Sequence, residues 1–151
     1  MSKISLLVTQ GGADTFAAGA IDTGLTADGK AGWQINAIRA FWVDGAAVAA
    51  ADHSLSAKVA TLATTTTFGT ADEIDRVSWG LQNTAGVAVA VAYEPVKEHY
   101  LVESRVTVQP NIYIQVESAG TGQANDVIVE VFYDVVKLSD LEVLRLLAGG
   151  A

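Results

Sequence analysis

Few residues in this sequence belong to the types that carry out chemistry. The chain has no cysteine and only two histidines, His53 and His99. Without cysteine it has no disulfide framework and no thiolate for catalysis or metal binding. His99 stands between Glu98 and Tyr100, where an imidazole beside a carboxylate could transfer protons. Because the sequence implies no serine or cysteine partner, we interpret His99 as a structural or exposed residue at a strand edge.

A short acidic segment offers the best candidate ligands for a metal ion. Asp72, Glu73 and Asp75 lie close together, and carboxylate oxygens are the ligands that Ca²⁺ takes in proteins. The segment lacks the alternating Asp/Asn pattern and the glycine of a known calcium loop. The favoured interpretation is a solvated acidic loop or one helical turn. We predict no cofactor, and leave calcium binding at these three residues open.

The segment Asp22-Thr23-Gly24, preceded by Ala20-Ile21, resembles the signature of the aspartic proteases. In that family a carboxylate shares a proton with a partner carboxylate and activates water. A chain of 151 residues would have to supply the second aspartate by dimerising, and Leu25 stands where the signature usually continues with Ala or Ser. A turn that ends a strand is the simpler interpretation, because three-residue matches are common by chance. We predict that the chain is not an enzyme, with an aspartic-protease-like dimer using Asp22 as an alternative.

Three tryptophans, Trp33, Trp42 and Trp79, could bind carbohydrate if they shared an exposed face, because aromatic rings stack on sugars. Each of them falls on a strand parity that is consistent with core packing. We therefore predict that all three are packing or assembly residues. A carbohydrate-binding β-sandwich module stays as an alternative function.

The elements that position these side chains are predicted to be β-strands. Residues 126–136 (DVIVEVFYDVV) and 111–118 (NIYIQVES) alternate strictly between apolar and polar positions, which is typical of strands with one face in a core. The glycine-containing loop between them predicts an antiparallel pair. Similar runs occupy residues 3–10, 14–22, 33–44, 54–64, 77–81, 87–93 and 100–109. Residues 46–51 are ambiguous between a short helix and a loop.

Inside residues 33–44 the apolar parity changes, from Trp33, Ile35 and Ala37 to Ile38, Ala40 and Trp42. A change of parity within one run predicts a β-bulge, or a strand that bends from one sheet to another.

One helix is predicted, at about residues 139–148. Ser139 is a good N-cap, and Glu142 three residues later completes a capping box. Leu138, Leu141, Leu144 and Leu147 form an apolar stripe. A helix this short cannot hold itself in water, so we predict that the four leucines are buried, mainly by docking within the chain.

Composition narrows the possible partners. The chain carries 17 acidic and 9 basic residues, a net charge of −8. Such a surface repels nucleic acids and anionic membranes. No apolar run reaches the length of a membrane span, and the N-terminal residues lack a secretory signal. We predict one β-sandwich domain over residues 1–151 that is made in the cytoplasm and binds no nucleic acid.

Eight to nine short strands at near-regular spacing predict an all-β fold, an antiparallel β-sandwich of the jelly-roll type. These valine- and alanine-rich strands, with no cysteine and no catalytic set, resemble viral single-jelly-roll capsid proteins and phage head-decoration proteins. The resemblance implies a virion protein that assembles with itself, as a trimer or larger shell, and with another virion protein as a possible second partner. The chain lacks the basic arm with which many capsid proteins bind the genome, which favours an outer decoration layer or a shell over another layer.

Overall fold

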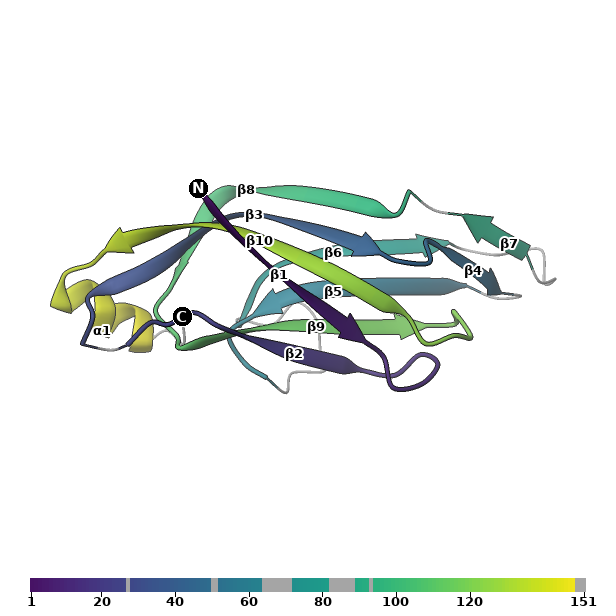
Figure 1. Cartoon of the computed structure of the whole chain (residues 1–151), viewed down its shortest axis with the longest axis horizontal. Coiled ribbons are helices and arrows are strands. Elements are labelled where there is room, and N and C mark those ends of the chain that lie inside the picture. The colour runs from purple at the N-terminus through teal and green to yellow at the C-terminus, as the bar shows by residue number, and fades with distance from the viewer. Residues whose placement is uncertain (27, 50–51, 64–71, 82–88, 93, 149–151) are drawn as a thin grey trace.

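Two four-stranded antiparallel sheets pack face to face in a β-sandwich (Figure 1). The computed structural model describes residues 1–26, 28–49, 52–63, 72–81, 89–92 and 94–148. The first sheet contains, in spatial order, β1 (Ser2–Thr9), β10 (Asp126–Lys137), β3 (Ala31–Trp42) and β8 (Val96–Thr107). The second contains β2 (Ala17–Asp22), β9 (Asn111–Ala119), β5 (His53–Ala60) and β6 (Glu73–Leu81). The helix α1 (Asp140–Ala148) follows β10. The predicted sandwich with a short C-terminal helix is confirmed.

The order of pairing is that of a jelly roll. The first half of the chain pairs with the second half in reverse order: β1 with β10, β2 with β9, β3 with β8, and β5 with β6. The chain is therefore one long antiparallel hairpin. Rolling it up brings β10 beside β3 and β5 beside β9, which closes the two sheets over one core.

A short two-stranded sheet extends this hairpin at residues 46–49, within the segment 46–51 that is predicted as a short helix or a loop; residues 50–51 lie outside the described residues. Ala46–Ala49 forms β4 and pairs with β7 (Val89–Ala92). The prediction was wrong because an alanine-rich sequence has little strand preference of its own. The position of β4 and β7 between the paired strands β3/β8 and β5/β6 makes this segment a strand.

The predicted pairing of residues 111–118 with 126–136 is also wrong. β9 lies between β2 and β5 in one sheet, and β10 lies between β1 and β3 in the other. Alternation correctly identifies both strands, but the hairpin rule assumes that neighbours in sequence pair with each other. In this rolled hairpin, β9 and β10 instead lie in different sheets, and the chain crosses from one sheet to the other between them.

The crossing loop at residues 120–125 is held in place by Asp14. One carboxylate oxygen accepts hydrogen bonds from Ser118 Oγ at 2.9 Å, Thr121 N at 3.0 Å and Thr121 Oγ1 at 2.6 Å. The other accepts one from Gly122 N at 2.9 Å. Burial opposes the charge of Asp14, but these four hydrogen bonds outweigh it and hold the pKa of the carboxyl below its ordinary value.

The predicted bulge lies at Asn36. Phe132 of β10 pairs with Ala37, and Tyr133 pairs with Ile35, so Asn36 is the extra residue. The bulge moves the inward parity of β3 by one position, which lets Ile35 and Ile38 both face the core.

Candidate functional site

The three tryptophans lie in the core, between 1% and 4% exposed. Trp33 stacks on Tyr133 with ring centroids 3.7 Å apart, and Trp42 lies 5.8 Å from Trp79 in a tilted arrangement. Trp42 Nε1 donates to Asn125 Oδ1 at 3.1 Å, which satisfies its polar atom. Because their rings are covered, these tryptophans do not form a sugar-stacking face.

Asp22 ends β2 in a tight turn. Its Oδ1 atom accepts a hydrogen bond from Gly24 N at 2.8 Å, and Gly24 has a φ of +69°. The carboxylate is therefore used to cap a turn, as aspartate commonly does. This arrangement matches the strand-ending turn rather than a protease site.

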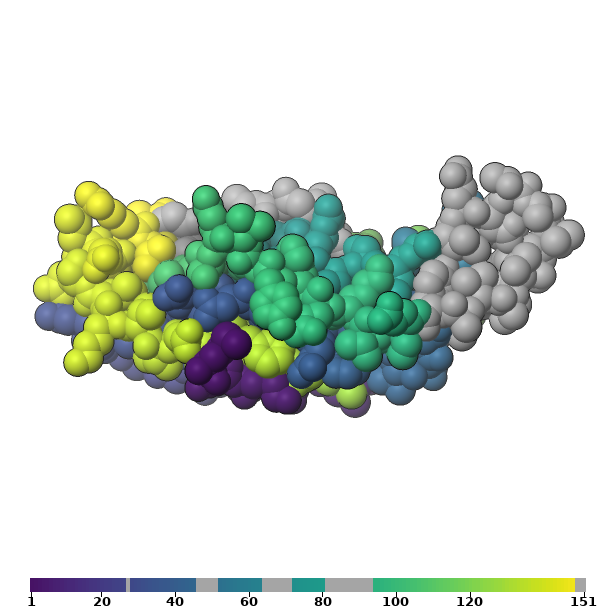
Figure 2. Space-filling view, turned by 90° about the horizontal axis from the view of Figure 1, so that it is seen from above, coloured from purple at the N-terminus to yellow at the C-terminus, as the bar shows by residue number. Residues whose placement is uncertain are grey.

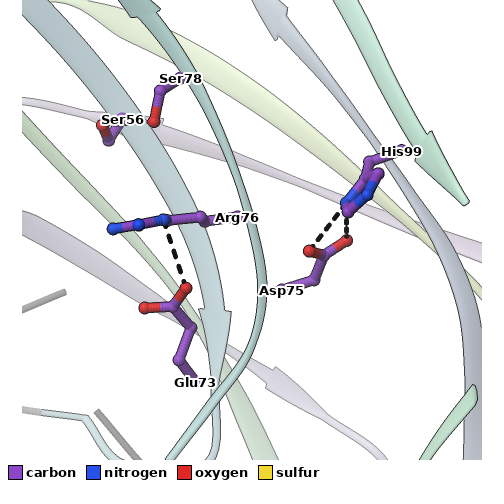
Figure 3. Close-up of polar contacts among 6 residues, drawn as sticks. All are labelled: Ser56, Glu73, Asp75, Arg76, Ser78 and His99. Carbon is purple, nitrogen blue, oxygen red and sulfur yellow. Dashed lines mark hydrogen bonds and ion pairs between the residues drawn. The ribbon is translucent and has the colours of Figure 1, made fainter. Parts of the chain in front are cut away.

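Most of the acidic segment is a strand instead of the predicted loop or helical turn, and Asp72 lies in a turn just before it. β6 begins at Glu73, and the carboxylates of Glu73 and Asp75 turn to different basic side chains (Figure 3). Glu73 Oε1 lies 3.5 Å from Arg76 Nε, and Asp75 is paired with His99. The prediction failed because this segment becomes a strand by pairing with β5, and that pairing is not visible in the acidic sequence itself.

Asp75 and His99 link the two sheets at the open edge of the sandwich, where β6 and β8 are the outermost strands. His99 Nδ1 lies 2.7 Å and 2.8 Å from the two oxygens of Asp75 (Figure 3). Lys97 makes a second link, donating from Nζ to the backbone oxygen of Ser78 at 2.6 Å. Sequence reasoning identified His99 as a strand-edge residue but missed its partner, which is 24 positions away.

These links lie beside a groove of about 560 Å³ between the two edge strands. It is lined by Arg76, Val77, Ser78, Glu94, Val96, Lys97, Glu98 and His99. The hydroxyl of Ser78 hydrogen-bonds to that of Ser56 at 2.8 Å, and the two lie apart from His99 in Figure 3. Among the described residues, the imidazole is therefore hydrogen-bonded to a carboxylate and to no hydroxyl, an arrangement that fits a structural link better than an acyl-transfer site.

A second charged cluster lies on the outer face of the first sheet. Glu130 of β10 is only 6% exposed and forms ion pairs with Lys3 of β1 and Arg39 of β3, the latter at 3.0 Å. The hydrogen bond from Lys3, followed by that from Arg39, holds the pKa of Glu130 below its ordinary value although burial opposes the charge. The Arg39 guanidinium also lies 5.3 Å from the centre of the Phe132 ring. The cluster joins three neighbouring strands.

The C-terminal helix has the predicted capping box. Glu142 N donates a hydrogen bond to Ser139 Oγ at 3.3 Å, and Ser139 N donates to Glu142 Oε2 at 2.7 Å.

The predicted burial of the leucine stripe is wrong. Val143 is the buried residue of α1, whereas Leu141, Leu144 and Leu147 are 57%, 63% and 39% exposed. Leu138, just before the helix, is half-buried. The helix is rotated from the predicted orientation, so that much of its leucine stripe is exposed. The helix lies at one end of the sandwich (Figures 1 and 2).

Comparisons with known proteins add little. No protein-family model matches the chain, and no curated protein matches it in sequence. Among solved structures, a virus-like particle of the extra small virus of the giant freshwater prawn Macrobrachium rosenbergii is similar over 88% of this chain and 79% of that chain. The sequence identity is 7% and the TM-score is 0.26, a likeness too low to indicate a shared function.

Over residues 1–26, 28–49, 52–63, 72–81, 89–92 and 94–148, no three or more His, Asp or Glu side chains gather as a metal site. Within the same ranges, no helix has the length and apolar character needed to cross a membrane.

Proposed function

We propose that this chain is a structural subunit that assembles with copies of itself into a protein shell, as a virion capsid or capsid-decoration protein. The role is structural rather than catalytic. The observation that carries the proposal is the outward-facing leucine stripe of α1, formed by Leu141, Leu144 and Leu147 on a rigid jelly roll. Contiguous exposed apolar side chains mark contact surfaces, and a capped helix holds these three in a fixed arrangement.

Burial of the tryptophans weighs against the carbohydrate-binding alternative, and the turn at Asp22 weighs against the protease alternative. The acidic surface favours contacts with protein over contacts with nucleic acid. In a virion, such a subunit fits an outer layer better than a layer that binds the genome.

The test is the native mass of the purified protein, measured by light scattering at micromolar concentrations. We expect a trimer or a larger particle. Leu144→Glu should lower the mass by placing a charge in the contact, whereas Leu62→Glu, at a leucine that is 56% exposed in the loop after β5, should not. A wild-type protein that stays monomeric at every concentration and salt would refute the proposal.

A further inference from the structure

β8 carries an insertion that projects from the first sheet. Ala37 of β3 pairs with Tyr100 and Ile35 pairs with Arg105. The residues from Leu101 to Ser104 therefore lie opposite the single residue Asn36. We call residues 101–104 the β8 knob. Val102 is the most exposed large apolar residue of the described chain, at 100%.

The base of the knob is held at several points. Leu101 packs against the core. Ser104 Oγ donates to Asn36 Oδ1 at 2.6 Å, and Asn36 Nδ2 in turn donates to Asp134 Oδ2 at 2.9 Å. These contacts hold an exposed valine in a fixed place, so a partner that binds it pays little ordering entropy.

An apolar cavity lies close to the knob. It has a volume of about 270 Å³ and is lined by Val106, Leu138, Glu142, Arg145 and Leu146, so it lies where β8 meets α1. The Glu142 carboxylate is turned toward the start of the helix, where the hydrogen bond from Ser139 N lowers its pKa. Arg145 is exposed in the last turn of the helix and supplies the positive charge at this cavity.

We propose that Val102 of one subunit inserts into this cavity on a second copy of the chain, with Glu103 beside the second copy's Arg145. The proposal rests on the function proposed above, because the partner is another subunit. The charges are complementary: among the described residues neither Glu103 nor Arg145 forms an ion pair at contact distance, although the charge of Arg145 also acts on Glu142 of its own helix. Since each subunit carries a net charge of −8, copies repel each other in general and approach best where opposite charges meet.

The positions of knob and cavity determine the symmetry of the contact. Val102 and Val106 are four residues apart, which limits their separation to about 14 Å even in an extended chain. The two features are therefore neighbours on one surface. A two-fold axis between them places each knob in the opposite cavity, so that the contact forms twice in an isologous dimer. The predicted building unit of the shell is this dimer.

Charge exchange tests the contact in the full-length protein, with dimerisation followed by analytical ultracentrifugation over a concentration series. Glu103→Arg and Arg145→Glu each place like charges at both contacts and should weaken dimerisation about five- to tenfold. The double variant should recover wild-type affinity to within about threefold. An equimolar mixture of the two single variants should also recover it, because each presents the opposite charge to the other at both contacts.

Val102→Asp should weaken dimerisation at least about tenfold, since it places a carboxylate in an apolar cavity. The matched control is Val43→Asp. Val43 is 53% exposed and follows the end of β3, whereas Val106 of the cavity pairs with Gln34 near the start of β3. Melting of the dissociated subunits should be unchanged in all variants, because every replaced side chain is exposed.

The outcomes separate this inference from the proposed function. If the wild type assembles but the Val102 and charge variants assemble equally well, the knob contact is refuted and the shell proposal stands. If the single charge variants weaken dimerisation and neither the double variant nor the mixture recovers it, the pairing of Glu103 with Arg145 is refuted. A wild type that never associates refutes both.

Discussion

Replacing Asp14 tests whether one carboxylate holds the crossing of the chain between the two sheets. Its side chain accepts four hydrogen bonds from residues 118–122, and its own φ is +52°, in the left-handed region. Three of the bonds are partly buried, and at about 1 kcal/mol each they contribute roughly 3 kcal/mol. Alanine in a left-handed conformation costs about 1 kcal/mol more. Asp14→Ala should therefore lower the free energy of unfolding by about 4 kcal/mol, or about 8–16 °C in Tm for a chain of this size.

Two further variants separate the two contributions. Asp14→Gly loses the hydrogen bonds but accepts a positive φ, so it should be about 1 kcal/mol more stable than the alanine variant. Asp14→Asn tolerates the positive φ and keeps one oxygen for the Ser118 and Thr121 donors, but turns an amide NH₂ toward Gly122 N. It should lose about 1–2 kcal/mol.

The effect of Asp14 depends on pH. Its pKa is lowered on folding, so its stabilising effect is fully present above the unfolded-state pKa of about 3.9. The effect is lost as the pH falls through the folded-state pKa. The stability gap between the wild type and Asp14→Asn should therefore narrow in acid.

Urea unfolding at pH 7 and in acid, followed by tryptophan fluorescence at one protein concentration, measures all four proteins. Asp44→Ala, at an exposed aspartate in the turn after β3, is the control and should stay within about 0.5 kcal/mol of the wild type. If Asp14→Ala also stays within that range, the network does not hold the loop and this reasoning is wrong.

Three more predictions follow from the burial, ion pairs and charge. Val143→Ala should cost about 2 kcal/mol of subunit stability in thermal melting, because Val143 is 6% exposed. Leu144→Ala should change the stability of dissociated subunits by less than about 0.5 kcal/mol. An equal loss of stability in both variants would contradict the observed orientation of the helix. Glu130→Gln should lower the free energy of unfolding in urea by about 1–3 kcal/mol, because Lys3 and Arg39 lose their shared carboxylate. The control Asp134→Asn, at an exposed carboxylate of the same strand, should lower it less. Gel-shift assays with mixed DNA and RNA at physiological salt should show no complex, given the net charge of −8, and binding that weakens steeply with salt would refute this.

Local patterns predicted the elements better than their partners. Alternation identified β9 and β10, the parity change identified the bulge at Asn36, and the Ser139–Glu142 capping box identified α1. Each of these signals lies within about ten residues of sequence. The physical cause is therefore present in the local chain, whatever the rest of the fold does.

The missed features all depend on contacts between distant residues. Asp14 and Thr121 are 107 positions apart, and Asp75 and His99 are 24 apart. Nothing in either neighbourhood specifies the other, since an aspartate in a loop or near a strand start has many possible uses. The rolling of the hairpin into two sheets brings the two residues of each pair together, and this rolling depends on the packing of the whole core.

The error at α1 has a different cause, and it points to the contact surface. The cap, the helix-forming residues and the leucine stripe all agree with a helix that buries its leucines, yet the subunit leaves Leu141, Leu144 and Leu147 largely outside the core. Fully burying a leucine is worth about 1.5–3 kcal/mol, so three side chains that are roughly half exposed leave about 2–5 kcal/mol of burial unused. A sequence that satisfies its local rules but not its tertiary ones is expected at functional surfaces. A neighbouring subunit that covers this stripe would recover the unused burial and complete the pattern that the sequence predicts.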